Sequence, residues 1–232
     1  MYEKTARYYD AIYSFKDYEG EVAQLHALIQ QRLPHATTLL DVACGSGKHL
    51  ELFKNLYTCE GLDYEPDFVR IAEERNPGMR IHQADFRDFE LGKRFDVVTC
   101  LFSAIGYAGT VEGLNNAIQS MANHLNPRGL LLIEPWLFPE DFKDKHVAGL
   151  YVDQPDLKIA RINNSRVEGR VSIFDMHHVV GTPDEVVTFV ERHALTLFTR
   201  EEYVEALTKA GLRVEFDEKG PMGRGLYIAS KT

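Results

Sequence analysis

The feature that most constrains this chain is a short apolar run that leads into two closely spaced glycines. Residues Thr38–Val42 have the composition of a buried parallel strand, and Gly45 and Gly47 follow it in a tight turn. Apolar residues then recur at helical spacing at Leu50, Phe53 and Leu56. Because glycine has no Cβ, the backbone at both glycines can pass close to a ligand. A strand, a glycine turn and a helix in this order predict a binding site for a nucleotide cofactor.

The spacing of the glycines distinguishes two kinds of cofactor site. Dinucleotide sites use the pattern G-x-G-x-x-G, which lets a pyrophosphate rest on the helix N-terminus. Here Leu50 stands at the third glycine position, which argues against NAD. The pattern D-x-A-x-G-x-G, which begins at Asp41, is instead the one that S-adenosylmethionine sites use. The alternative is a glycine turn that only joins a strand to a helix.

Length and charge limit the class of protein. A chain of 232 residues is expected to form one domain with an elaboration, and it is long enough to bury a substantial core. The net charge of −9 argues against a general nucleic-acid-binding surface. No apolar run approaches the ~20 residues of a membrane span. Because Met1–Lys4 also lacks a signal-peptide core, we expect neither secretion nor a membrane partner.

The cysteines indicate a reducing environment. Cys44, Cys59 and Cys100 are odd in number, widely spaced, and lie in or near expected core strands. We therefore expect buried, reduced thiols in a cytoplasmic protein. Neither the cysteines nor the histidines have the spacing of metal ligands, so no metal site is expected.

Strands and helices alternate over the first 135 residues. The strands expected after Thr38–Val42 are Tyr57–Asp63, Met79–Asp85, Phe95–Phe102 and Leu130–Glu134. Helical patterns occupy residues 1–36, a segment that opens at Pro66, and residues 112–125, with a turn at Asn126–Gly129. A closing hairpin, Leu212–Phe216 and Gly225–Ala229, brings the strands to seven. The alternation predicts an α/β fold with a doubly wound, mostly parallel seven-stranded sheet of the Rossmann-like type.

This rhythm breaks after the fifth strand. Between residues 149 and 198 apolar and polar residues alternate, as in Lys158–Ile162, which predicts an antiparallel β insertion. A helix is expected next, because Thr199 and Glu202 have the spacing of a capping box. The expected units are an N-terminal helical segment or lid (1–36), a cofactor-binding core (37–148), the insertion (149–198) and a return to the core sheet (199–232).

Acidic residues stand where two of the parallel strands are expected to end. In a doubly wound sheet, ligands bind outside the carboxyl ends of the strands. Asp63 ends the second strand, where a carboxylate can accept hydrogen bonds from two ribose hydroxyls. Asp85 and Phe86 end the third strand, where an acid suits an adenine amino group and a ring suits its face. A single acid there could be a turn residue, but two acids behind a glycine turn favour a cofactor site.

These segments together resemble the class I S-adenosylmethionine-dependent methyltransferases. The resemblance is carried by Asp41–Gly47, Gly61–Asp63, Gln83–Phe86 and Phe95–Val98. It implies S-adenosyl-L-methionine as the cofactor. The cofactor-binding positions that it implies are Tyr18, Asp41, Ala43, Gly45, Gly47, His49, Asp63, Tyr64, Asp85, Phe86 and Leu101.

A closer resemblance, to the amino-sugar N,N-dimethyltransferases, covers nearly the whole chain. It is carried by Phe102–Tyr107, Glu134–Pro139 and Gly220–Leu226, and by the β-rich insertion. It implies methylation of the amine of a dTDP-linked amino sugar, and an insertion that encloses the sugar nucleotide and contributes to a homodimer. The chain departs from the family at Ser14–Lys16, where members carry a Gly- and Arg-containing stretch.

The same resemblance implies which residues meet the acceptor. Tyr13 and Tyr107 match positions around the sugar amine and are the candidate catalytic residues, as orienting groups; the alternative is that both are packing aromatics. The implied substrate-binding residues are Tyr13, Tyr107, Glu134, Trp136 and Arg224. Arg224 could clamp a diphosphate through its planar fork, and a surface ion pair is the alternative. In-line methyl transfer needs little acid or base, so proximity and orientation can supply most of the acceleration.

Three other functions remain open from the sequence. The chain could methylate another small molecule, such as a glycine-type amine or a hydroxyl. An NAD-dependent oxidoreductase would be a different class, and Leu50 argues against it. A non-catalytic module that retains the cofactor fold is the last alternative.

Overall fold

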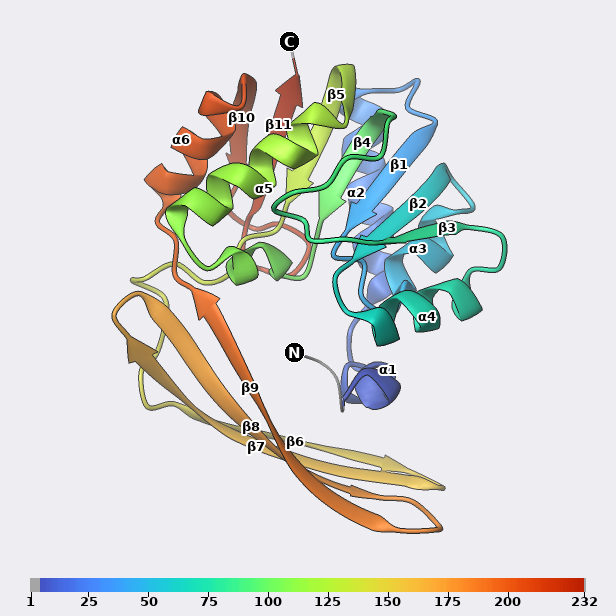
Figure 1. Cartoon of the computed structure of the whole chain (residues 1–232), viewed down its shortest axis with the longest axis vertical. Coiled ribbons are helices and arrows are strands. Elements are labelled where there is room, and N and C mark those ends of the chain that lie inside the picture. The colour runs from blue at the N-terminus through green and yellow to red at the C-terminus, as the bar shows by residue number, and fades with distance from the viewer. Residues whose placement is uncertain (1–4, 232) are drawn as a thin grey trace.

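The computed structural model describes residues 5–231, so the Met1–Lys4 segment lies outside the described residues. Seven strands form the main sheet, in the order β10-β11-β5-β4-β1-β2-β3 (Figure 1). Their bounds are β1 Thr38–Val42, β2 Thr58–Asp63, β3 Arg80–Gln83, β4 Phe95–Cys100, β5 Leu125–Ile133, β10 Leu212–Asp217 and β11 Leu226–Lys231. Strands β1 to β5 pair in parallel, and β11 runs antiparallel to both β5 and β10. The predicted doubly wound, mostly parallel sheet is therefore confirmed.

Helices cover both faces of this sheet. Their bounds are η1 Ala6–Tyr8, α1 Tyr9–Ile12, α2 Tyr18–Arg32, α3 Lys48–Phe53, α4 Pro66–Arg75, η2 Ala104–Ala108, α5 Val111–Asn123 and α6 Arg200–Lys209. Side chains of α5 and α6 share one buried cluster with Leu40, whereas α2, α3 and α4 share another with Leu39. Consecutive residues of β1 thus pack into opposite cores, which explains why Leu39 and Leu40 are both apolar.

The predicted antiparallel insertion forms a second sheet, sheet B, between β5 and α6. Its strands are β6 Val147–Gln154, β7 Leu157–Glu168, β8 Val171–Gly181 and β9 Val186–Thr196, paired in sequence order. In Figure 1 this sheet extends from the main body, and α1 lies between the two. Tyr8 and Ile12 form a small core there with Val152, Ile159 and Val180. The N-terminal segment therefore joins the insertion to the body.

Three local expectations need correction. Asn126–Gly129 is not a free turn, because β5 begins at Leu125 and absorbs these residues as a bulge, with Arg128 at φ 64°. Helix α3 ends at Phe53, so Leu56 lies beyond it and is 42% exposed. The N-terminal helical segment is interrupted between Ile12 and Tyr18, where α2 begins.

Other local expectations are confirmed. Thr199 and Glu202 form the predicted capping box at the start of α6. Cys44, Cys59 and Cys100 are free and buried. Among residues 5–231, no helix is long and apolar enough to cross a membrane.

Candidate active site

A pocket opens at the carboxyl ends of β1 and β4, the edge of the sheet where a ligand was expected. Residues from the N-terminal segment, the glycine turn and the end of β4 line it. The predicted cofactor residues in this lining are Tyr18, Asp41, Ala43, Gly45, His49 and Leu101. The lining residues that sequence reasoning did not single out as ligand contacts are Tyr9, Cys44, Ser46, Lys48 and Phe102.

The two glycines of the turn serve different purposes. Gly45 has φ +55°, and a Cβ built on it would meet no atom within 4 Å, so it faces open space in the pocket. Gly47 has φ +74°, and its Cβ would stand 2.8 Å from Asn76 Nδ2 and 3.0 Å from the Ala72 Cβ. Gly45 therefore fits the expected close approach of a ligand. At Gly47 the missing Cβ instead allows α4 to pack against the turn. The expectation that the absence of a Cβ at this position serves the approach of a ligand therefore needs correction.

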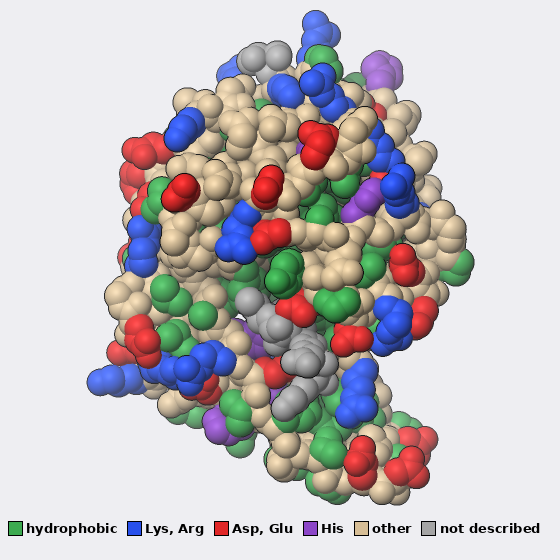
Figure 2. All heavy atoms as spheres, in the orientation of Figure 1, with side chains coloured by type: hydrophobic (Ala, Val, Ile, Leu, Met, Phe, Trp, Pro, Cys, Tyr) green, Lys and Arg blue, Asp and Glu red, His purple; other side chains and the backbone are tan. Residues whose placement is uncertain are grey.

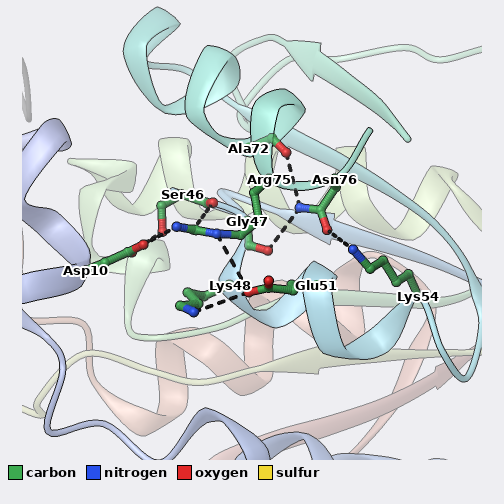
Figure 3. A network of polar contacts seen from close by, with 9 residues as sticks. All are labelled: Asp10, Ser46, Gly47, Lys48, Glu51, Lys54, Ala72, Arg75 and Asn76. Carbon is green, nitrogen blue, oxygen red and sulfur yellow. Dashed lines mark hydrogen bonds and ion pairs between the residues drawn. The ribbon is translucent and has the colours of Figure 1, made fainter. Parts of the chain in front are cut away.

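A polar network ties the turn to α1 and α4 (Figure 3). Arg75 donates to the Asp10 carboxylate and to the Ser46 carbonyl, and Ser46 Oγ donates to Asp10 Oδ1 at 2.7 Å. Asn76 Nδ2 donates to the Gly47 carbonyl at 3.2 Å. These bonds hold the N-terminal segment across the glycine turn, so the pocket wall is assembled from parts distant in sequence.

Asp63 fastens the turn to the neighbouring strand. Its Oδ2 accepts from the Gly45 N–H at 2.7 Å, and its Oδ1 accepts from the Glu65 N–H at 3.0 Å. Burial raises the pKa of Asp63 to about 6, although both N–H groups favour the charged form. Asp63 is thus more than a turn acid, because it determines where Gly45 lies.

Asp41 is a second buried acid at the floor of the pocket. Thr99 Oγ1 donates to Asp41 Oδ1 at 2.7 Å, and burial raises the pKa of the carboxyl group. The pocket lining does not include the predicted cofactor residues Tyr64, Asp85 and Phe86. Tyr64 is 62% exposed, and Asp85, two residues past β3, forms a bidentate ion pair with Arg87. Phe86 is buried in the core that contains α5.

A buried charged cluster, missed by sequence reasoning, borders the pocket. The Glu21 carboxylate accepts from the Lys16 ammonium and lies 2.9 Å from His49 Nε2. The Lys16 nitrogen stands 4.3 Å from the centre of the Tyr18 ring and 4.9 Å from that of Phe102. The only signal in the sequence was the departure from the family at Ser14–Lys16. Lys16 brings a cation to the pocket from that stretch.

Sheet B contacts both tyrosines that were predicted to meet the acceptor. Arg161 Nη1 of β7 donates to the Tyr13 hydroxyl at 3.3 Å. His193 Nδ1 of β9 lies 2.8 Å from the Tyr107 hydroxyl, and burial lowers the pKa of His193 to about 4. His193 is therefore a neutral partner at physiological pH. Neither Arg161 nor His193 could be found from sequence spacing, because the contacts span more than 80 residues.

The segment that follows β4 is backbone-strained. Phe102 and Ser103 have φ of 52° and 64°, the left-handed region that side chains other than glycine rarely adopt. Glu134 Oε2 accepts from the Phe102 N–H at 2.7 Å, and Ser103 Oγ donates to the Pro135 carbonyl at 2.7 Å. The end of β5 therefore holds this turn, which places the Phe102 ring against the Tyr13 ring with centroids 5.2 Å apart.

Arg224 covers this strained turn. Its Nη1 donates to Ser103 Oγ at 2.9 Å, and its guanidinium carbon lies 5.2 Å from the Trp136 ring centre and 5.7 Å from that of Phe102. Trp136 Nε1 in turn donates to Ser172 Oγ of β8 at 2.9 Å. Within the described part of the chain, Arg224 forms no ion pair, which contradicts the surface ion pair considered above.

The arrangement suits a ligand with hydroxyls and a positive charge. Buried carboxylates can accept hydrogen bonds from hydroxyl groups, and the faces of the aromatic rings attract a cation. Residues 5–231 contain no group of three or more His, Cys, Asp or Glu side chains placed to hold a metal ion.

Comparison with known proteins agrees with this geometry. A family model described as a methyltransferase domain matches residues 39–129. The dTDP-3-amino-3,6-dideoxy-alpha-D-glucopyranose N,N-dimethyltransferase of Streptomyces fradiae is 43% identical over 96% of this chain and 89% of its own length. The dTDP-4-amino-2,3,4,6-tetradeoxy-D-glucose N,N-dimethyltransferase of Saccharopolyspora spinosa is 42% identical over 95% of this chain and 90% of its own length.

A solved structure extends the match to three dimensions. The S-adenosylmethionine-bound amino pentose methyltransferase CalS10 of Micromonospora echinaspora superimposes with a TM-score of 0.86 and is 40% identical. The match covers 94% of this chain and 92% of that protein, so it includes sheet B as well as the main sheet.

The burial of Asp63 predicts that the free energy of unfolding depends on pH. Its pKa in the folded chain, about 6, exceeds the ordinary aspartate value, so the folded state holds its proton to higher pH than the unfolded state does. The free energy of unfolding should therefore fall, by up to about 3 kcal/mol, as pH rises from about 4 to about 6. Urea unfolding of wild type and Asp63→Asn should be measured across this pH range. The difference between the two proteins gives the contribution of Asp63, because asparagine does not titrate.

The exposed Asp156→Asn serves as the matched control and should keep the wild-type pH dependence. Parallel curves for wild type and Asp63→Asn would show that Asp63 ionises normally in the folded protein.

Proposed function

Because the chain belongs to the dTDP-amino-sugar N,N-dimethyltransferases of the S-adenosylmethionine-dependent methyltransferases, we propose that it methylates the amine of a dTDP-linked amino sugar. The observation that carries the substrate class is the extent of the match. The methyltransferase domain alone, residues 39–129, would support only the cofactor. The relatives also match the insertion and the closing strands, which supply Arg161, His193 and Arg224 to the site.

The cofactor side of the proposal rests on the pocket beside Gly45. S-adenosylmethionine supplies a methyl group on a positively charged sulfur, which is an electrophile. The Asp63 carboxylate would accept hydrogen bonds from the ribose hydroxyls, and Asp85 and Phe86 would meet the adenine. Aromatic rings line the pocket and can attract the positive charge through a face that Lys16, which stands over Tyr18 and Phe102, does not cover.

On the acceptor side, the protein contributes mainly position. A neutral amine attacks the methyl carbon in line, and alignment alone can supply a large part of the acceleration. Tyr13 and Tyr107 would orient the sugar. Hydrogen bonds from sheet B already fix both hydroxyls, so little side-chain freedom is lost when the acceptor binds.

The direct test is turnover with a panel of acceptors. We expect S-adenosylmethionine and a dTDP-3-amino or dTDP-4-amino deoxyhexose to yield a monomethylated and then a dimethylated product, detected by mass spectrometry. The panel includes both amine positions because the relatives differ in this respect. Glycine and the corresponding hydroxyl sugars are the controls. Methylation of glycine without methylation of any dTDP-amino sugar would contradict the proposal.

We propose that Arg224 binds the substrate diphosphate or a neighbouring oxygen of the sugar nucleotide. The chain carries a net charge of −9, so an anionic substrate needs local cations against an unfavourable overall field. Arg224 is held over Trp136 and Phe102, and among the described residues no carboxylate lies within ion-pair distance of it. Its planar fork matches a diphosphate in two hydrogen bonds at once.

Arg224→Ala should therefore lower the affinity for the sugar nucleotide about tenfold or more, which is the loss of a charged hydrogen bond of ~1.5–3 kcal/mol. Affinity for S-adenosylmethionine should stay near that of wild type. Arg224→Lys should also bind the sugar nucleotide weakly, because lysine lacks the planar, two-pronged guanidinium group. Calorimetric titration of both ligands separates the effects; unchanged sugar-nucleotide affinity in Arg224→Ala would make Arg224 a residue of the strained turn alone.

We also propose that the outer face of sheet B pairs with a second copy of the chain. Register places Ile162 beside Gly149 and His177, and His177 beside Val190, on the face away from the small core around Ile159. Apolar side chains gather on this face with large exposed fractions: Val147, Tyr151, Ile162, Val179, Val186 and Val190. An apolar sheet face of this kind is typical of an interface between protein chains.

A substitution at the centre of this face tests the dimer. Wild type should have the mass of a dimer by light scattering at micromolar concentration, and Ile162→Asp, which places a charge at a residue 59% exposed, should have the mass of a monomer. Val204→Asp on α6 is the control, because Val204 is also exposed but lies on the main body. A monomeric wild type would contradict the proposal.

We propose a cytoplasmic location and no nucleic-acid or membrane partner. Free, buried cysteines fit a reducing compartment. Acidic and basic side chains are interspersed over the face drawn in Figure 2, without the continuous basic surface that a nucleic acid needs.

A further inference from the structure

One carboxylate oxygen at the site has no hydrogen-bond partner. Glu134 is 1% exposed, and its Oε2 accepts from the Phe102 N–H, but its Oε1 is buried without any partner within the described chain. We propose that Glu134 Oε1 binds the amine that is methylated and accepts a proton from it. This inference rests on the proposed function and adds a specific acceptor contact to it.

The energetics require a partner for this oxygen. A buried carboxylate that leaves an oxygen unpaired loses its hydration without compensation, which is why such groups are rare in folded proteins. Lys16 and Arg224 favour the charged form of Glu134, but Lys16 is paired with Glu21, and Arg224 donates to Ser103. The charge at Glu134 Oε1 therefore remains available to a cation that brings its own N–H groups.

The position of Glu134 joins the two halves of the site. Its carboxylate holds Phe102, a residue that lines the cofactor pocket. The ring of Phe102 contacts Tyr13, and Arg224 lies over the same ring. Glu134 is thus attached to a residue that lines the cofactor pocket and also contacts the proposed acceptor groups.

The chemistry of the acceptor matches this oxygen. An alkyl amine is largely protonated at neutral pH and cannot attack while its electron pair holds a proton. Transfer of that proton to Glu134 Oε1 breaks one N–H bond and leaves the pair on nitrogen. The pair then forms the N–CH₃ bond, and the electrons of the broken S–CH₃ bond return to sulfur, which becomes a neutral thioether. The nitrogen product is again an ammonium group. Glu134 releases the first proton to water when the product leaves, and the restored carboxylate can take the new ammonium proton before the second transfer.

The charges around Glu134 make it suitable as a base. Burial raises the pKa of Glu134, whereas Arg224 and Lys16 lower it and Glu21 raises it further. Cys100, the other titratable group beside it, stays a thiol because burial and the nearby acids raise its pKa. A carboxylate with a raised pKa takes a proton more readily than an ordinary one.

Two ammonium groups enter such a site, that of the acceptor and that of the methionine part of the cofactor. We assign Glu134 to the acceptor because it lies near Arg224 and two residues before Trp136, in the segment that directly follows β5. Separate titrations with the amino sugar and with S-adenosylmethionine show which of the two ammonium groups depends on Glu134.

Glu134→Gln keeps an oxygen for the Phe102 N–H and removes the charge. We expect kcat/KM for the amino sugar to fall about tenfold or more near pH 7, and the deficit to shrink toward about pH 9.5, where more of the amine is already neutral. Affinity for the amino sugar should fall, and affinity for the corresponding hydroxyl sugar and for S-adenosylmethionine should not. A purely structural role for Glu134 would give a deficit that does not change with pH.

Glu74→Gln, the same substitution at an exposed residue of α4, should behave as wild type in each measurement. Thermal unfolding of Glu134→Gln confirms that the variant is folded. Equal loss of S-adenosylmethionine affinity, or a deficit that is constant with pH, overturns the inference. Turnover of wild type on the acceptor panel is measured in the same experiment. If wild type methylates a dTDP-amino sugar but Glu134→Gln shows no pH-dependent deficit, only the role of Glu134 is wrong and the proposed function stands.

Discussion

The site depends on the hydrogen bond from the Gly45 N–H to the buried Asp63 carboxylate. This bond fixes the turn after β1 to the end of β2 at 2.7 Å, with Gly45 left facing open space. Burial of the acid costs stability, since it raises the pKa of Asp63 to about 6, and the hydrogen bonds from two N–H groups offset only part of that cost. A carboxylate held at this position, at the carboxyl edge of the sheet, is then available to ribose hydroxyls. Burial of Asp63 thus lowers the stability of the folded chain but fixes the shape of the pocket.

A second constraint brings the acceptor groups to the same edge. The strained Phe102–Ser103 turn is held by Glu134 from the end of β5 and covered by Arg224, which lies just before β11. Sheet B contributes Arg161 and His193 to the two tyrosines. The insertion therefore does more than extend the fold, because it supplies a hydrogen bond to each of the two hydroxyls.

The sequence predicted most of the fold because the fold is periodic. Buried strands such as Thr38–Val42 and the alternation in Lys158–Ile162 are local patterns, and each can be recognised from a few residues. The bulge at Asn126–Gly129 was missed because the residues of a turn and of a β-bulge overlap, and only pairing with β4 decides between them. The site was predicted less completely. The ion pair of Lys16 with Glu21 and the contacts of Arg161 and His193 depend on tertiary structure, which sequence spacing does not encode.

We propose that the turn anchored by Asp63 binds S-adenosylmethionine rather than a dinucleotide. The decisive experiment is isothermal titration of the purified wild type and of Asp63→Ala with S-adenosylmethionine, S-adenosylhomocysteine and NAD. Wild type should bind both S-adenosyl compounds and not NAD, and Asp63→Ala should bind them about tenfold or more weakly while remaining folded. Binding of NAD by wild type, or unchanged affinity in Asp63→Ala, would contradict it.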